Sequence, residues 1–457
     1  MGATGRTGGA DAHGGNGMQL RVIPLVLVGV LAVALSACTR RNCVPDSLAT
    51  NRNLVDLSAD PTAHPVITKG LTSEVAAEFR RHSAGQHPPG ARPYTFLALS
   101  GGGLYGSFGV GVLHGWTESG SRPTFDVVTG ISTGALMAPL AFLGPAYDSV
   151  LQENMLGVKR ADILRSRSFL RIPFADAIYS SRPMARRIEE VCTPKVLAEV
   201  AAAHAMGRRL YIGTTNIDSR RLVIWDMGAI ASQGTEESTK LFRQILLASS
   251  SIPGAFPPVP IKVEIDGKEY EELHVDGGAS DEVIFRSFMV GDLNRLAGVP
   301  GAQAPAGSTL YVIENGKLYA DPKCIRPRLT DMISASFRSI IYGKARDELY
   351  RIYLNCLETG VEFRLLATPQ DYHLKSSGGL GLTSDDQHRL FELGALLGSH
   401  AGSGEGWRDV PPGTDPSEQA MPRAGTRFTT QGGSGAACYP PPVDGRSSSP
   451  GLPVTSR

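Results

Sequence analysis

The chain has 457 residues, of which 42 % are hydrophobic and 19 % are charged, so it can bury a sizeable core. Its length fits one large α/β domain with appended tails as well as it fits two domains. The formal net charge of +1 does not indicate a nucleic-acid partner.

The amino-terminal region contains a predicted export signal. Residues 1–17 are rich in glycine and are predicted to be disordered. Arg21 then precedes an apolar run from Val22 to Leu35, which is shorter than the ~20 residues that a membrane-spanning helix needs. A basic residue, a short apolar run and small residues before a cleavage point are typical of a secretory signal peptide, here ending at residue 37. An uncleaved membrane anchor helix is the alternative.

The end of this run, Leu35-Ser36-Ala37-Cys38, resembles the lipobox of bacterial lipoproteins. The resemblance implies cleavage before Cys38, acylation of its thiol, and an exported protein anchored by lipid in the bacterial cell envelope. Thr39 after Cys38, in place of an aspartate, favours the periplasmic face of the outer membrane. Residues 38–90 are then a tether and a covering segment.

Predicted strands and helices alternate between residues 91 and 400. The strands cover 94–99, 125–128, 209–214, 222–226, 262–265, 269–273 and 308–313, and the helices cover 104–118, 133–142, 235–249, 331–354 and 384–397. Asp266-Gly267 separates two strands and predicts a hairpin turn, and Ser384 is the expected N-cap of the last helix. The alternation indicates an α/β fold with a mainly parallel central sheet flanked by helices. Residues 401–457, rich in Gly, Ser and Pro, are a predicted disordered tail.

The first of three glycine-containing motifs is Gly130-Ile131-Ser132-Thr133-Gly134, between a predicted strand and a predicted helix. A nucleophile elbow requires this context, because the glycines permit a tight turn that exposes the serine hydroxyl. The amino terminus of the following helix adds positive partial charge near the serine. An N-cap in an ordinary strand–helix turn has a similar pattern, so the motif alone is not specific.

The second motif, Gly101-Gly102-Gly103-Leu104-Tyr105-Gly106, also lies between a strand and a helix. Three glycines expose backbone N–H groups that can face an anion, as a phosphate cradle for a nucleotide or as an oxyanion hole for acyl transfer. The nucleotide interpretation is weak, because the loop has no Gly-Lys-Ser/Thr sequence. Asp126, near the distance expected in a dinucleotide site, starts its strand instead of ending it.

The third motif, Asp276-Gly277-Gly278, follows a predicted strand. An aspartate at a strand end with glycines behind it can face a cleft and leave room for a reactant. In isolation, however, Asp-Gly is above all a turn signal.

Together, the glycine loop, the Gly-x-Ser-x-Gly motif about 30 residues later and the distant Asp-Gly-Gly resemble the patatin-like phospholipases. Residues 212–216 and 248–258 match that family further. The resemblance covers residues 94–288, with weaker similarity to residue 400. It implies a three-layer fold in which residues 291–400 complete a catalytic domain at 91–290.

The resemblance also implies roles for single residues. Ser132 is the expected nucleophile and Asp276 its base, in a dyad without histidine. The backbone N–H groups of Gly101, Gly102 and Gly103 are the expected oxyanion hole. The glycines that support these turns are Gly106, Gly130, Gly134, Gly277 and Gly278.

Two positions depart from the family pattern. The family's loop often opens with aspartate and often carries a basic residue before its last glycine, where this chain has Ser100 and Tyr105. The oxyanion hole depends on backbone N–H groups, so both departures are compatible with it. A contact between the side chain at position 105 and a charged head group is not expected.

The implied activity is hydrolysis of a lipid or other acyl ester, without a cofactor or a metal. An aspartate with an ordinary pKa of about 3.9 is a poor base for a hydroxyl, so burial in a dry cleft is expected to raise the pKa of Asp276. The five cysteines other than Cys38 show no CxxC spacing, so no zinc site is expected and disulfide pairing stays open.

Two other functions stay open at this point. A Ser-His-Asp α/β-hydrolase would use one of the late histidines, His373, His388 or His400. A catalytically silent lipid-binding lipoprotein would keep the fold without the reaction. His274 lies two residues before Asp276 and can line the cleft, although core packing is the simpler interpretation. The head group, the acyl position and the oligomeric state are not predicted.

Overall fold

The computed structural model describes residues 42–43, 91–158, 165–166, 177–321, 324–375 and 381–412. The predicted signal peptide, Cys38 and most of the predicted covering segment therefore lie outside the described residues. None of the helices within the described part of the chain combines the length and the apolar character that crossing a membrane requires.

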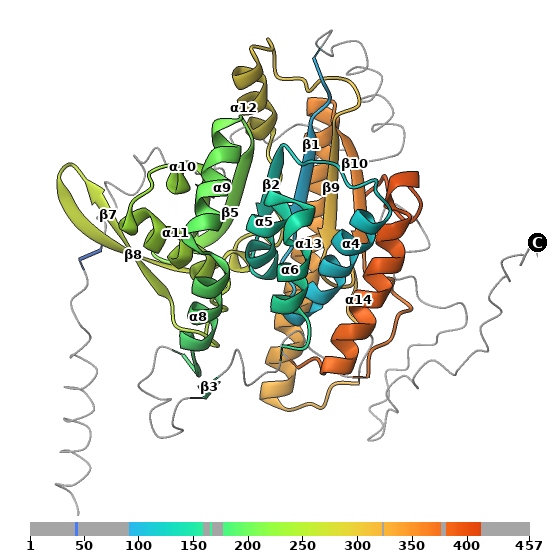
Figure 1. Ribbon diagram of the computed structural model, residues 1–457. Helices are drawn as coiled ribbons and strands as arrows, with labels where there is room; N and C mark the ends of the chain where they lie inside the picture. Colours follow the sequence, from blue (N-terminus) through green and yellow to red (C-terminus); the bar gives the residue numbers. More distant parts are fainter. Residues whose placement is uncertain are drawn as a thin grey trace, which may run out of the picture.

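An eight-stranded sheet forms the centre of the molecule (Figure 1). Five strands run parallel in the order β10-β9-β1-β2-β5. The antiparallel strand β8 pairs with the same edge of β5 as β2, further along β5, and β7 pairs with β8. Strand β6 pairs with the other edge of β5. Their bounds are β1 Thr95–Leu99, β2 Val127–Gly130, β5 Arg209–Asn216, β6 Arg221–Asp226, β7 Val259–Ile265, β8 Lys268–Asp276, β9 Thr309–Glu314 and β10 Glu362–Ala367. The expected mainly parallel sheet is confirmed.

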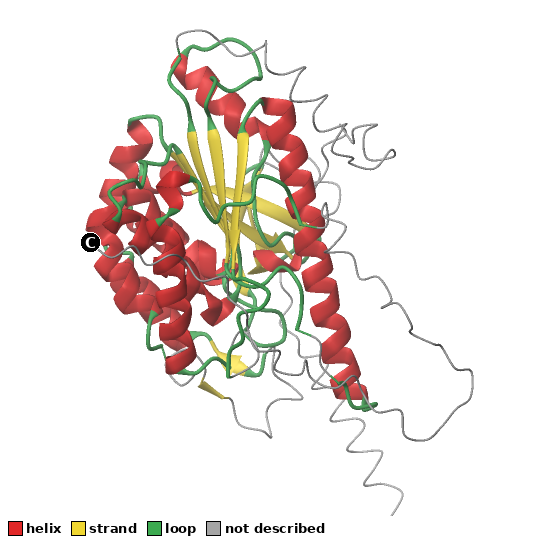
Figure 2. Ribbon diagram, turned by 90° about the vertical axis from the view of Figure 1, so that its right-hand side faces the viewer, coloured by secondary structure: helices red, strands yellow, loops and turns green. Residues whose placement is uncertain are grey.

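Both faces of the sheet are covered, which explains why β1 is apolar on consecutive residues. Phe96 and Ala98 share one core with residues of α12 and α13, whereas Leu97 and Leu99 share the other with residues of α4, α5 and α11. Figure 2 shows the sheet between these two helical layers. The bounds are α4 Gly106–Glu118, α5 Thr133–Leu143, α11 Glu236–Ser249, α12 Ser287–Ala297 and α13 Leu329–Thr359.

The remaining elements lie around this three-layer body. The helices are α6 Asp148–Met155, α8 Arg182–Val191, α9 Pro194–Ala205, α10 Met227–Ala231 and α14 Ser384–Ser399. The 3-10 turns are η2 Gly103–Tyr105, η3 Pro145–Tyr147, η5 Gly277–Ala279 and η6 Ala401–Ser403, and a small separate sheet consists of β3 Arg165–Ser166 and β4 Tyr179–Ser180.

The predicted elements are present, with shifted ends. The Asp266-Gly267 hairpin is confirmed, because both residues have positive φ, at 51° and 74°. The predicted N-cap of α14 is wrong by one residue, since the Thr383 side chain accepts from the backbone N–H of Asp386 and Ser384 is already helical. Helices α6, α8, α9, α10 and α12 and strands β3, β4 and β10 were not predicted.

The predicted start of the disordered tail at residue 401 is also wrong. Trp407 is only 9 % exposed, and its ring lies 5.5 Å from that of Trp116 and 5.1 Å from that of Tyr311. Arg408 exchanges two backbone hydrogen bonds of 2.8 Å with Leu365 of β10. Aromatic burial and strand pairing therefore order residues 401–412 against the body, and the rest of the predicted tail lies outside the described residues.

Candidate active site

Ser132 lies in the turn between β2 and α5, as predicted. Its backbone has φ 54° and ψ −121°, and it is one of three non-glycine residues with positive φ in the described part of the chain. A Cβ at Gly134 would lie 2.3 Å from the carbonyl oxygen of Leu99, and one at Gly130 would lie 2.4 Å from that of Gly134. Glycine is therefore needed at both positions for α5 to pack this closely on the sheet, which forces the strained turn at Ser132.

Asp276 is the last residue of β8, and its carboxylate contacts the serine. The Ser132 Oγ donates a hydrogen bond of 2.7 Å to Asp276 Oδ2, and the backbone N–H of Gly278 donates one of 2.8 Å to Asp276 Oδ1. Ser132 is 9 % exposed and Asp276 is 4 % exposed. The structure therefore brings together two residues that the sequence motifs placed far apart.

Burial raises the pKa of Asp276 to about 6. The hydrogen bonds from the Ser132 hydroxyl and the Gly278 N–H and the charge of Lys344 oppose this rise, because each favours the carboxylate. Lys344 on α13 donates a hydrogen bond of 2.9 Å from Nζ to the carbonyl oxygen of Gly278. The pKa of Asp276 is therefore closer to neutral pH than that of an ordinary aspartate, which makes its carboxylate a more effective base.

A run of three serines at the end of α11 holds both residues. The Ser249 Oγ accepts from the backbone N–H of Ser132 at 3.0 Å and donates to the carbonyl oxygen of Gly213 at 2.7 Å. The Ser250 Oγ donates to the carbonyl oxygen of Ser132 at 3.3 Å, and the carbonyl oxygen of Ser251 accepts from the backbone N–H of Asp276 at 2.9 Å. The sequence marked this segment as a family match but did not predict these contacts.

The glycine loop lies beside Ser132, with one correction to its predicted role. The backbone N–H of Gly101 donates to the carbonyl oxygen of Glu282 at 3.0 Å, so it is not free to bind an oxyanion. Gly102 and Gly103 have φ values of 149° and 59°, and their N–H groups have no acceptor among the described residues. Two of the three predicted donors therefore remain available.

Ser100 connects this loop to the end of β9. Its Oγ accepts from the backbone N–H of Asn315 and donates to the carbonyl oxygen of Gly101, both at 2.8 Å. The Asn315 side chain returns a hydrogen bond of 2.8 Å to the carbonyl oxygen of Ser100. A Cβ at Gly102 would lie 2.0 Å from the carbonyl oxygen of Asn315, so only glycine fits there. Serine in place of aspartate thus positions the loop.

A largely apolar cavity opens beside the serine. It encloses about 920 Å³, part of which is open to solvent. Ser132, Thr133 and Gly103 form one part of its wall. Its apolar lining comes from α5, α6, α8, α11 and the segments after α6 and α11, through Leu136, Leu140, Leu151, Met155, Val158, Met184, Ile188, Val191, Leu246, Ile252 and Phe256. This space fits an acyl chain better than it fits a polar substrate.

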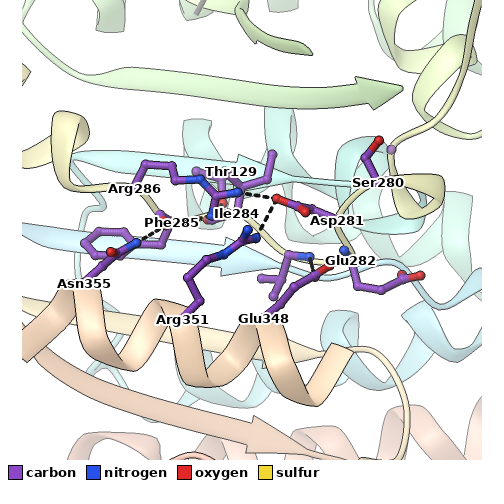
Figure 3. A network of polar contacts seen from close by, with 12 residues as sticks. Thr129, Ser280, Asp281, Glu282, Ile284, Phe285, Arg286, Glu348, Arg351 and Asn355 are labelled. Atoms are coloured by element: carbon purple, nitrogen blue, oxygen red, sulfur yellow. Dashed lines mark hydrogen bonds and ion pairs between the residues drawn. The ribbon is translucent and has the colours of Figure 1, made fainter. Parts of the chain in front are cut away.

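Acidic side chains gather behind the dyad, and the sequence did not identify them. Figure 3 shows Arg286 and Arg351 both directed at Asp281, and Glu348 of α13 accepting from the backbone N–H of Glu282. Burial raises the pKa of Glu282 well above its usual range and that of Glu348 to about 7. This network holds the loop that follows Asp276.

None of the described histidines forms a hydrogen bond with Ser132 or Asp276. His373, His388 and His400 are exposed, and the ring of His114 packs on that of Phe391. His274 is fully buried, where its Nδ1 lies 2.9 Å from the Thr214 Oγ1 and its ring packs on Trp225, so the core-packing interpretation is confirmed.

Cysteines and acidic groups do not form a metal centre within the described residues, where no cluster of three or more His, Cys, Asp or Glu side chains could hold an ion. Cys43, Cys192 and Cys356 are free thiols, and Cys324 takes part in a disulfide bond.

A serine at a strand–helix elbow, a buried carboxylate on its hydroxyl and free N–H groups beside an apolar cavity together define a serine hydrolase. Residues 97–289 match the family model of the patatin-like phospholipases. The chain therefore contains a patatin-like phospholipase domain and is a lipid ester hydrolase.

The solved structures that are similar to the chain include the following two. VipD from Legionella pneumophila shares 11 % identity with a TM-score of 0.31, over 66 % of this chain and 67 % of that one. The type III effector protein ExoU shares 13 % identity with a TM-score of 0.23, over 70 % of this chain and 55 % of that one. A comparison with the sequences of curated proteins gives no significant match.

Proposed function

We propose that this protein hydrolyses long-chain carboxylic esters of lipids with Ser132 as nucleophile and Asp276 as general base. The hydrogen bond of 2.7 Å between the two side chains, buried beside an apolar cavity, is the observation that carries this proposal. No histidine is needed, because the carboxylate oxygen already lies within the reach required for proton transfer.

The reaction has two halves. Asp276 accepts the hydroxyl proton as the Ser132 Oγ attacks the ester carbonyl carbon, and the N–H groups of Gly102 and Gly103 bind the oxyanion. The tetrahedral intermediate expels the alcohol, which takes the proton from Asp276 and leaves an acyl-enzyme. Asp276 then deprotonates a water molecule that attacks the acyl carbonyl, and the proton returns to the Ser132 Oγ as the fatty acid leaves.

Three features of the site make this chemistry reasonable. The raised pKa of Asp276, about 6, brings the base closer to the pH at which it works. The positive φ of Ser132 holds its hydroxyl at the end of the sheet, above the amino terminus of α5. Each oxyanion donor contributes about 10²–10³ in rate in related chemistry, so two free N–H groups are sufficient for strong stabilisation.

The cavity indicates how the substrate lies. The acyl chain occupies the space lined by α5, α6, α8 and α11, and its carbonyl carbon reaches Ser132 beside Gly103. The alcohol part then leaves toward solvent, so the cavity selects the acyl chain more strongly than the head group.

A lipid panel tests this proposal. Purified protein is incubated with phospholipid, lysophospholipid, triacylglycerol and short-chain acyl esters, and the released fatty acid is measured together with labelling by a fluorophosphonate probe. Ser132→Ala should abolish release and labelling, whereas Ser399→Ala, at the exposed end of α14, should retain both. If the unmodified protein released no fatty acid and reacted with no probe, the silent lipid-binding function would be correct instead.

We further infer that acyl chains on Cys38 anchor the protein at the outer membrane. Asn42, four residues later, accepts a hydrogen bond of 3.0 Å from the backbone N–H of Glu271 and donates one of 2.7 Å to the carbonyl oxygen of Glu269. Four extended residues span at most ~14 Å, so the anchor would hold the β7–β8 hairpin close to the membrane.

Metabolic labelling with a fatty acid and membrane fractionation test the anchor. The label should appear on the unmodified protein and on Cys43→Ser, an exposed cysteine nearby, but not on Cys38→Ser. A protein that stays in the membrane without any label would instead carry an uncleaved anchor helix.

A further inference from the structure

The first three turns of α13 stand apart from the rest of this 31-residue helix. Its carboxyl-terminal half packs into the core through Leu349, Ile352 and Tyr353, which are at most 2 % exposed. None of the described side chains at positions 329 and 331–340 is buried. Figure 2 shows one end of this long helix extending past the sheet, away from the other helices.

This exposed segment is apolar on one face. Leu329, Met332, Ile333, Phe337 and Ile340 are between 52 % and 75 % exposed, and they make up five of the ten large hydrophobic residues exposed in the described part of the chain. At about 100° per residue, these five side chains lie within an arc of about 140°. Asp331 and Arg338 lie on the opposite side. A contiguous exposed apolar face of this kind indicates an interaction surface.

Positive charge lies at the amino-terminal end of this face. Arg326 and Arg328 directly precede the helix, and both are exposed. Arg338, also exposed, lies on the third turn, on the side of the helix away from the apolar face. Among the described residues, none of these three guanidinium groups has a carboxylate partner, whereas Arg286 and Arg351 further along the chain both pair with Asp281. An apolar face with two unpaired arginines, Arg326 and Arg328, at its end matches a bilayer surface that carries anionic head groups.

The position of this segment relative to the active site is set by the topology. The carboxyl ends of the parallel strands β1, β2 and β9 carry the glycine loop, Ser132 and Asn315, and the chain passes from the same end of β9 into the start of α13. Lys344 touches the backbone of Gly278. At 1.5 Å per residue, Ile340 lies about 6 Å and Leu329 about 22 Å further along the helix axis.

We propose that the apolar face of residues 329–340 docks on the surface of an anionic lipid bilayer and thereby presents the serine site to its substrate. Aromatic and aliphatic side chains enter the boundary between head groups and acyl chains, and the arginines bind lipid phosphates. A second copy of the chain fits this face less well, because three unpaired arginines on each copy would repel each other. Binding of this face to a bilayer does not require catalysis. Only its role in presenting the serine site to a lipid substrate rests on the proposed function.

Vesicle binding tests the proposal with the full chain carrying Cys38→Ser, so that acyl anchoring is absent from every sample. The test variant replaces Ile333, Phe337 and Ile340 with serine. The matched control replaces Met206, Leu296 and Leu396 with serine, since these three are 74 %, 45 % and 59 % exposed on other surfaces. Co-sedimentation is measured with phosphatidylcholine vesicles that contain about one third phosphatidylglycerol, and hydrolysis of a soluble short-chain ester is measured in parallel.

The α13 variant should bind these vesicles at least about tenfold more weakly than the parent, with unchanged turnover of the soluble ester, while the control variant should bind like the parent. Omitting phosphatidylglycerol should weaken binding of the parent. Equal binding by the α13 variant and the parent would overturn the proposal. So would a parent dimer that this variant dissociates without any change in vesicle binding, because a second copy would then cover the face. If the parent bound vesicles but hydrolysed no ester, the proposed function would fail and the docking surface would stand.

Discussion

Ser132 and Asp276 are separated by 144 residues, yet the hydroxyl of one donates a 2.7 Å hydrogen bond to the carboxylate of the other. Strand β5 brings them together, since Gly130 of β2 pairs with Ile212 and Asp276 of β8 pairs with Thr214 on the same edge of β5. The carboxyl ends of β2 and β8 therefore point at each other and meet beside Gly213. A Cβ at Gly277 would lie 2.6 Å from the carbonyl oxygen of Gly213, so no side chain fits at position 277 where the two strand ends meet.

Replacing Asp276 with asparagine should lower kcat for ester hydrolysis about 10²–10⁴-fold, the range for losing a general base. Asparagine keeps an acceptor for the Gly278 N–H but cannot take the serine proton. Steady-state kinetics on a soluble ester provide the measurement. Asp292→Asn, on α12, is the matched control and should retain activity. Near-normal turnover by Asp276→Asn would mean that another group is the base.

Activity should fall on the acid side with a midpoint near pH 6, because Asp276 must be ionised to act as a base and its pKa is about 6. Below that midpoint, kcat/KM should drop tenfold per pH unit. The charge of Lys344 lowers this pKa, so Lys344→Gln should move the midpoint to higher pH. Lys375→Gln, exposed and paired with Asp385, should leave the profile unchanged.

The same shift predicts a stability effect. The pKa of Asp276 is about 6 in the folded chain against an ordinary 3.8, so the unfolded chain ionises first as the pH rises. The loss of folding free energy caused by ionising the buried carboxylate therefore grows between pH 4 and 6. Above pH 6 it is fully present and reaches about 3 kcal/mol. Asp276→Asn should therefore have a higher Tm than the unmodified protein at pH 8, and the difference should vanish below pH 4. A lower Tm for the variant at pH 8 would contradict this account.

Sequence patterns predicted the main strands of the sheet and singled out Ser132 and Asp276, which the structure brings into contact, because turns with glycine and short apolar strands leave local signals. Gly130-Ile131-Ser132-Thr133-Gly134 was informative because close packing requires both of its glycines, Gly130 against Gly134 within the motif and Gly134 against Leu99 of β1. The contacts of Ser249 and Glu282 were not predictable in this way. Ser249 depends on the register of β5, and Glu282 on a backbone contact with Gly101 from a segment far along the chain.

The same limit explains the two errors in the predicted site and tail. Gly101 had the right residue type for an oxyanion donor, but its N–H is used by a distant carbonyl group that no local pattern reveals. The tail was judged from its average composition, which hides the single Trp407 that packs on Trp116 and Tyr311. Long-range pairing decides both cases.

The glycine loop offers a test that separates backbone geometry from general strain. Gly102→Ala should lower kcat about 10²–10³-fold, because a Cβ there would lie 2.0 Å from the carbonyl oxygen of Asn315 and would displace the oxyanion donors. Gly120 also has a positive φ, at 69°, but nothing lies within 4 Å of its missing Cβ. Gly120→Ala therefore also places a side chain at a positive φ, but without a clash, and should retain full turnover. Equal losses in both variants would show that the loop acts through stability alone, which a thermal melt would reveal.

The depth of the cavity should determine which acyl chains are accepted. Leu140 lines it eight residues beyond Ser132, about 12 Å along α5, whereas Thr133 and Leu136 line it closer to the serine. Leu140→Phe should therefore reduce kcat/KM for long-chain esters while short-chain esters, which do not reach that depth, are hydrolysed as before. Leu113→Phe on α4 provides the control, since Leu113 is equally buried but does not line the cavity, and the strain of about 1–3 kcal/mol from overpacking is similar. A series of p-nitrophenyl esters of increasing length measures the ratio directly. If Leu140→Phe lowered activity equally at every length, the acyl chain would lie elsewhere and the cavity would have another occupant.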